Sequence, residues 1–270
     1  MSDAMQSESY GRRWVFESMY TVFSLVVAGV VPPNADDLVA EIRDEFGRIE
    51  SRLSVFQPDT EISRWRAGRL AYAKLSAETR AIITDCDLAE ELTGGLFSAR
   101  RDGEYDPTGY VKGWALAQAG RMLTEAGIGS YCLNGGGDIT ARGVNGDGAP
   151  WQLGVAHPYR AGEMSIVIAA PVDDGRPIAV ATSGTTERGA HISNPLDGWR
   201  PVNSSVTVVG HDIAFVDMAA TAAVAAGKDG SAAPAALVQR LGLEAFGFDE
   251  NRHPWWTPGM TKYALLPEFK

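Results

Sequence analysis

Apolar and polar residues repeat with two different periods along the chain. Residues 20–29, YTVFSLVVAG, are rich in β-branched and aromatic residues and end in glycine, a pattern that predicts a strand. Residues 34–56 begin with Asn-Ala-Asp, and their apolar positions recur every three or four residues, which predicts an N-capped helix. The same spacing predicts helices over 75–95, capped by Ser76 and closed by Gly94-Gly95, and over 111–127.

The middle of the chain changes to short apolar runs bounded by glycine and proline. Such runs are typical of strands, and they occupy residues 130–143, 151–158, 164–172, 177–184 and 204–210. Two further helices are predicted over 214–227 and 232–242. The sequence contains no internal repeat and no low-complexity linker. Because helices cluster early and strands cluster in the middle, we predict an α+β fold rather than alternating βαβ units.

Composition narrows the possible partners. The 270 residues are 45% hydrophobic and carry a formal net charge of −10, which is typical of a globular protein that does not bind nucleic acid or anionic membranes nonspecifically. Cys86 and Cys132 give neither a disulfide framework nor zinc spacing. Arg12 and Arg13 precede an apolar run, but Glu17 intervenes and no cleavage site follows. We therefore expect a cytoplasmic protein, with export the less favoured alternative.

A small-residue stretch, AFVDMAATAAVAAG, contains a carboxylate and a hydroxyl. If residues 214–227 are helical, Asp217 and Thr221 lie one turn apart on the same face. That oxygen pair suits a hard cation such as Mg²⁺. The alternative is a carboxylate stabilised by the helix dipole, with the threonine bonding back to a carbonyl. These two residues alone favour the alternative.

Three other stretches contain candidate functional residues, and each also has a purely structural interpretation. LNGGGDI, residues 133–139, is either a backbone approach to an anionic ligand or a hairpin turn. Thr182, Ser183 and then His191 form either a phosphate-binding loop with a base or a solvated loop. Lys112 near a helix start opposes the helix dipole, so it has either a special partner or a surface position.

Taken in order, these stretches resemble the ApbE family of FAD:protein FMN transferases, over about residues 16–245. The chain has counterparts of the family's motifs in the same order. These motifs are Met-Gly-Thr, a serine-rich segment, the Asp-Pro-Thr and Lys-Gly segments, Asn-Ala-Gly-Gly-Asp-Ile, Ala-Thr-Ser-Gly with a following histidine, and Ala-Asp-Ala-x-Ala-Thr-Ala. The matching segments are 19–21, 54–66, 106–115, 134–139, 181–184, 191–195, 205–208 and 216–222.

The resemblance implies one ApbE-like domain over 16–270, with mixed or antiparallel sheets flanked by helices, after a flexible N-terminal segment over 1–15. It implies transfer of FMN from FAD to a threonine or serine hydroxyl of a target protein, with release of AMP. It assigns Mg²⁺ to Asp217, Thr221 and the carbonyl of Gly109, and the catalytic roles to His191 and Lys112. The residues it places against FAD are Met19, Thr21, Asp106, Asn134, Gly136, Gly137, Asp138, Thr182 and Ser183.

The chain departs from the family pattern at a few positions. Tyr20 stands for glycine, Arg66 for asparagine and Asn194 for aspartate, and two segments that are separate in longer members are merged over 106–115. Two alternatives therefore stand beside transfer: a FAD pyrophosphatase that yields FMN and AMP, and a non-catalytic FAD-binding protein.

Overall fold

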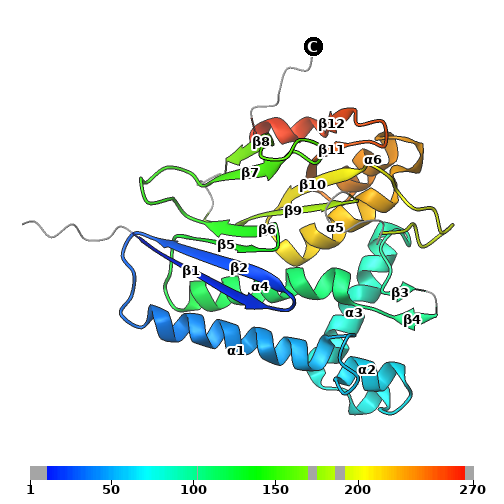
Figure 1. The fold of residues 1–270 in the computed structure, drawn as a ribbon, viewed down its shortest axis with the longest axis horizontal. Coiled ribbons are helices and arrows are strands. Elements are labelled where there is room, and N and C mark those ends of the chain that lie inside the picture. Colours follow the sequence, from blue (N-terminus) through cyan, green and yellow to red (C-terminus); the bar gives the residue numbers. More distant parts are fainter. Residues whose placement is uncertain (1–10, 102, 170–174, 186–191, 265–270) are drawn as a thin grey trace, which may run out of the picture.

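One antiparallel sheet organises the protein. The computed structural model describes residues 11–101, 103–169, 175–185 and 192–264. Eight strands lie in the order β1-β2-β5-β6-β9-β10-β11-β12, and each neighbouring pair is antiparallel (Figure 1). Their bounds are β1 Gly11–Ser18, β2 Thr21–Ala28, β5 Tyr131–Gly135, β6 Asp138–Arg142, β9 Ile178–Gly184, β10 Ser205–Gly210, β11 Glu244–Phe248 and β12 Pro254–Trp256.

Helices and two small hairpins complete the described part of the chain. The hairpins pair β3 Arg100–Arg101 with β4 Glu104–Tyr105, and β7 Gln152–Ala156 with β8 Met164–Ala169. The helices are α1 Ala35–Leu53, α2 Glu61–Arg66, α3 Ala77–Thr93, α4 Thr108–Glu125, α5 Ile213–Ala225 and α6 Ala232–Arg240, with 3₁₀ turns at Tyr72–Lys74, Gly227–Asp229 and Pro258–Lys262. The α+β prediction is confirmed.

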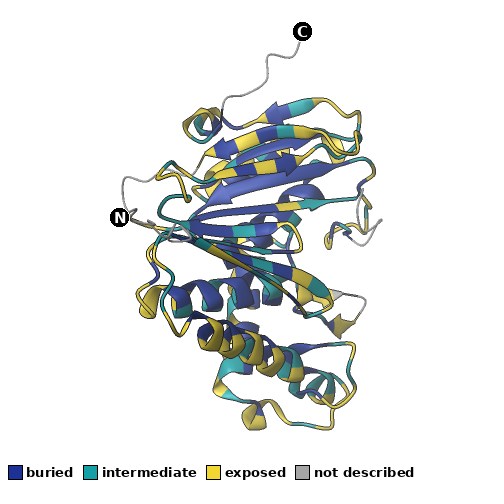
Figure 2. Ribbon diagram, turned by 60° about the vertical axis from the view of Figure 1, so that its left-hand side comes forward, coloured by how far each residue is buried: buried dark blue, intermediate teal, exposed yellow. Residues whose placement is uncertain are grey.

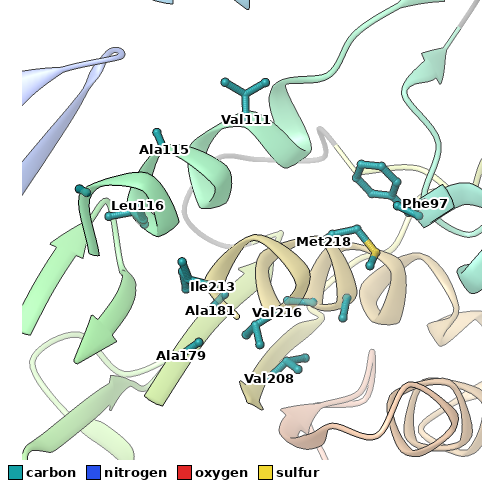
Figure 3. Packing of buried hydrophobic residues seen from close by; sticks show 14 of the residues in the cluster. Phe97, Val111, Ala115, Leu116, Ala179, Ala181, Val208, Ile213, Val216 and Met218 are labelled. Carbon is teal, nitrogen blue, oxygen red and sulfur yellow. The ribbon is translucent and has the colours of Figure 1, made fainter. Parts of the chain in front are cut away.

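The central strands are buried on both faces, and the two faces carry different side chains. Along β9, Ala179 and Ala181 belong to the core shared with the helices, while Ile178 and Val180 belong to the core under the β7–β8 hairpin. This follows from the two-residue period of a strand. Figure 2 shows the buried strands between more exposed outer elements. The small residues on the helix face let α5 pack closely, as Figure 3 shows for Ala179, Ala181 and Val216.

Local signals place most of the predicted elements correctly. The α3 prediction is confirmed at both ends: the Ser76 side chain accepts a hydrogen bond from the Thr79 N–H, and Gly94 adopts φ +65°. Residues 11–15, expected within a flexible segment, instead form most of β1. Phe16 is buried against the helices, and Arg12 pairs with Asp36 of α1 at 2.7 Å, so one face of this edge strand is anchored to α1. Within the described residues no helix is long and apolar enough to cross a bilayer.

Candidate functional site

A glycine sets the distance between α4 and α5. A methyl group at Gly113 would lie 2.9 Å from Cα of Ala214 and 2.9 Å from the carbonyl oxygen of Ile213. Both atoms belong to the backbone of α5, so a larger residue would push the helices apart. The close approach brings Lys112, the residue before Gly113, against the face of α5 that carries Asp217. Helix geometry thereby places a lysine beside the carboxylate of a buried aspartate.

Five polar residues from four elements meet at this helix contact, and we call them the floor: Lys112, Asp138, Ser183, Asp217 and Thr221. Lys112 Nζ pairs with Oδ2 of Asp138 and lies 3.8 Å from Oδ2 of Asp217. Ser183 Oγ lies 3.1 Å from Oγ1 of Thr221, which is one helical turn beyond Asp217. The floor thus combines one cation, two buried carboxylates and two hydroxyls.

Strand alternation decides which polar side chains reach the floor. Ser183 follows Ala179 and Ala181 at two-residue spacing and so shares their helix face. The side chain of Thr182 points to the other face, where its hydroxyl lies 2.8 Å from that of Thr207. Its backbone N–H, however, is 3.3 Å from Oδ1 of Asp138. Of the two adjacent candidates, only Ser183 contributes its hydroxyl to the floor.

Four of the floor residues, Lys112, Ser183, Asp217 and Thr221, line a cavity of about 500 Å³, a size typical of small-molecule sites. Thr108, Gly109 and Lys112, from the first turns of α4, line it, which places a helix N-terminus at the cavity wall. The other lining residues are Met19, Tyr20, Thr21, Glu50, Leu53, Ser54, Phe56, Leu96, Phe97, Ser98, Asp106, Val111, Gly136, Thr182, Ser183, Gly184, Ile192, Ser193, Pro195, Asp217 and Thr221.

Four other lining residues, two of them strongly exposed, form a part of the cavity wall that we call the mouth: Met19, Tyr20, Glu50 and Phe56. Tyr20 and Phe56 are each more than 70% exposed, and their rings meet edge to face with centroids 5.6 Å apart. Met19 and Tyr20 connect β1 to β2 with φ values of 48° and 58°. Such left-handed conformations cost side-chain-bearing residues about 1–3 kcal/mol each. The carboxylate of Glu50 accepts the Met19 N–H at 3.2 Å and thereby braces the turn.

The glycine-rich stretch is a two-residue hairpin turn that also borders the cavity. Gly135 pairs with Asp138 across the turn, and Gly136 and Gly137 adopt φ values of 61° and 98°. Gly136 lines the cavity, whereas Asn134 holds the turn by accepting the Gly137 N–H at 3.0 Å. The hairpin and ligand interpretations of this stretch are therefore compatible. The turn also starts β6 at Asp138.

The described histidines and cysteines do not supply a base or a nucleophile to this cavity. His191 lies outside the described residues. The described histidines, His157, His211 and His253, are not among the lining residues. Burial raises the pKa of the Cys86 thiol to about 12 and that of Cys132 to about 11, so neither is a thiolate nucleophile at neutral pH.

Most of the residues singled out from sequence come together. The ten that line the cavity are Met19, Thr21, Asp106, Gly109, Lys112, Gly136, Thr182, Ser183, Asp217 and Thr221. Asp138 joins them through Lys112, while Asn134 and Gly137 support the turn. Glu50 and Phe97 also line the cavity, and no distinctive local sequence pattern points to either of them. Glu50 becomes recognisable only when α1 and the β1–β2 turn are seen side by side.

Two departures from the family pattern lie away from the cavity lining, and one lies at the mouth. The Arg66 guanidinium pairs with Glu104 at the β3–β4 hairpin. Asn194 is buried in a turn, where its side-chain oxygen accepts the Leu196 N–H at 2.8 Å. Neither residue lines the cavity. Tyr20 does, so it is the departure that bears directly on what the cavity binds.

Comparison with known proteins places the chain in a family. A sequence model of the ApbE family matches residues 19–101 and 98–246. The chain belongs to the ApbE family. Among solved structures, the ApbE protein of Thermotoga maritima superimposes with a TM-score of 0.80 at 20% identity, covering 94% of this chain and 99% of that one. The flavin transferase ApbE of Vibrio cholerae has a TM-score of 0.76 at 20% identity, with the same coverage. These likenesses establish an ApbE fold.

Curated ApbE relatives match over a shorter span. A protein of Vibrio cholerae is 32% identical over 130 residues, which are 44% of this chain and 37% of that protein. A protein of Rhodobacter capsulatus is 34% identical over 136 residues, which are 47% of this chain and 25% of that protein. Both are named FAD:protein FMN transferase. The matches thus span 37% and 25% of the lengths of these two curated relatives.

Proposed function

We propose that this ApbE family member transfers FMN from FAD to a threonine or serine hydroxyl of a target protein and releases AMP. The observation that carries the proposal is the single cavity that joins the buried floor of Lys112, Asp217 and Thr221 to an exposed aromatic mouth. A dinucleotide with a charged pyrophosphate and a flat ring system needs both kinds of surface. The names of the curated relatives support the same reaction.

A divalent cation fits the floor, and we propose Mg²⁺ held by Asp217, Thr221 and the main-chain carbonyl of Gly109. The available donors are hard oxygens, which Mg²⁺ prefers. Among the residues that the structure describes, no three His, Cys, Asp or Glu side chains converge, so a cation would depend on hydroxyl and carbonyl oxygens as well. When bound, Mg²⁺ would neutralise the negative charge that accumulates on the pyrophosphate during displacement.

The chain's own groups account for binding and charge at the reacting centre. The N-terminus of α4, with Thr108 and Gly109 at the cavity wall, offers partial positive charge to the phosphates. Lys112 adds a full positive charge next to it. Tyr20 and Phe56 offer flat apolar faces for the flavin ring at the mouth. This arrangement would orient FAD with its pyrophosphate at the floor.

Transfer forms one bond and breaks one. The acceptor hydroxyl oxygen attacks the phosphorus of the FMN half, the oxygen bridge to AMP breaks, and AMP leaves with the electron pair. The hydroxyl proton needs a base, and His191 remains our proposal because an unperturbed histidine has a pKa of about 6.5. Ile192 and Ser193, which follow it directly, line the cavity. The presence of these two described residues at the cavity supports the proposal.

The test is incubation of the protein with FAD, Mg²⁺ and an acceptor protein that carries one reactive threonine. Intact-mass spectrometry should detect FMN on the acceptor, and chromatography should detect an equal amount of AMP. An acceptor in which that threonine is valine is the matched control and should stay unmodified. AMP with free FMN and no modified acceptor would favour the pyrophosphatase, and FAD binding without AMP would favour the non-catalytic protein.

A further inference from the structure

Lys112 contacts two carboxylates that come from different elements. Asp138 is the first residue of β6, and Asp217 lies on α5. The side chain of Asp138 is 1% exposed and that of Asp217 is 7% exposed, while that of Lys112 is 20% exposed. Buried carboxylates are strongly unfavourable unless a cation or hydrogen-bond donors compensate them. Lys112 is the cation that the structure places between these two.

The surroundings of the two carboxylates differ. Asp138 receives the Thr182 backbone N–H through Oδ1 and contacts Lys112 through Oδ2. Asp217 lies 3.8 Å from Lys112 and has the Thr221 hydroxyl one turn away on the same helix face. Asp138 is therefore the stronger partner of the ammonium group. Asp217 is the carboxylate whose neighbours supply further oxygen ligands.

We propose that Lys112 is the built-in counter-cation of the metal-free floor and limits its affinity for a divalent cation. In the metal-free protein the ammonium group compensates both carboxylates. When a divalent cation binds at Asp217, the ammonium group keeps only Asp138, because two cations repel each other in a buried site. This inference rests on the proposed metal site, and it adds Lys112 as the residue that sets the affinity of that site for the cation. Gly113 supports this arrangement because it lets α4 pack closely against α5.

The experiment compares Lys112→Met with Lys228→Met. Lys228 pairs with Asp197 at 2.6 Å on the surface and is not among the cavity-lining residues, so its replacement removes the same charge without touching the floor. Isothermal titration calorimetry with MgCl₂ should give at least tenfold tighter binding for Lys112→Met than for wild type. Without Mg²⁺, the same variant should melt at a lower temperature, and saturating Mg²⁺ should restore most of the loss. Lys228→Met should match wild type in Mg²⁺ affinity.

Each outcome decides the matter. Unchanged or weaker Mg²⁺ binding in Lys112→Met would overturn the proposal. If that variant is unfolded without metal, circular dichroism during a Mg²⁺ titration decides instead: folding on addition of Mg²⁺ supports the proposal, and a chain unfolded at every Mg²⁺ concentration contradicts it. Lys112→Arg keeps the charge and should bind Mg²⁺ no more tightly than wild type.

A separate variant distinguishes this inference from the function on which it rests. Asp217→Asn should abolish Mg²⁺ binding in the calorimeter. If wild type and Asp217→Asn bind Mg²⁺ equally, the metal site itself is wrong. If binding depends on Asp217 but is the same in wild type and Lys112→Met, only the role of Lys112 is wrong.

Discussion

The floor and the mouth of the cavity are built in opposite ways. The floor is buried and charged, and its residues sit on α4, α5, β6 and β9, which the core holds in place. The mouth is exposed and aromatic, and its centre is a strained two-residue turn that Glu50 braces. Rigid, desolvated charges suit a chemical step, whereas exposed rings suit binding of a flat group. We infer that the floor determines turnover and the mouth determines affinity.

Asp217→Asn should have the largest effect on the proposed difference between floor and mouth, because it keeps the shape of the side chain and removes its charge. We expect turnover to fall on the order of 10²–10³-fold, the scale for losing one preorganised charge-stabilising group. AMP release under saturating FAD and Mg²⁺ measures it. Full Mg²⁺-dependent activity in this variant would place the chemistry elsewhere.

The next largest effect should come from the helix contact under the floor. Gly113→Ala puts a methyl group 2.9 Å from backbone atoms of α5, and overpacking of this kind costs about 1–3 kcal/mol of unfolding free energy. Gly47→Ala is the matched control, because that glycine lies within α1 and, apart from its neighbours and the helix's own backbone, no atom lies within 4 Å of the added methyl. It should stabilise the protein by up to about 1 kcal/mol. Urea unfolding of both variants gives the comparison, and two changes of the same sign would contradict it.

A third change separates two neighbours on β9. Ser183→Ala removes the hydroxyl that faces Thr221, and we expect turnover to fall about tenfold, near the upper end for one hydrogen bond. Thr182→Val instead removes the partner of Thr207, so it should lower the melting temperature and leave turnover nearly unchanged. Steady-state AMP release and thermal melting distinguish the two. The reverse pattern would show that the wrong strand face has been assigned to the floor.

The smallest effect is expected at the mouth. Tyr20→Gly removes an aromatic face, and we expect FAD to bind roughly three- to tenfold more weakly, since an aromatic contact contributes about 0.5–1.5 kcal/mol. Relief of the left-handed strain should offset the lost Phe56 contact, so stability should change little. Fluorescence titration with FAD measures the affinity. Tyr20→Phe keeps the ring and should bind like wild type.

Sequence patterns predicted the floor better than the mouth, for a physical reason. Asp217 and Thr221 share a helix face because of helical periodicity, and that pairing can be read from four-residue spacing. The glycine-rich turn can be predicted because glycine tolerates positive φ. The contact between Glu50 and Met19, by contrast, joins residues 31 apart and depends on how α1 packs beside β1 and β2. No local pattern encodes it.

The same distinction explains the missed strands. β1 alternates only weakly between buried and exposed positions, since as an edge strand it is covered on one side by α1 and open on the other. β11 is buried at four consecutive positions and so shows no alternation, and β12 is only three residues long. Both are fixed by pairing with β10 and with each other. The interiors of the long helices could be predicted because each carries its own hydrophobic repeat.

The most direct test of the division between floor and mouth is the maximal rate of AMP release, measured at saturating FAD and Mg²⁺ in Asp217→Asn and Tyr20→Gly together. Our account predicts that the rate collapses in Asp217→Asn and stays within about twofold of wild type in Tyr20→Gly, whose defect should vanish once FAD saturates. Equal losses of maximal rate in the two variants, or a loss only in Tyr20→Gly, would contradict it.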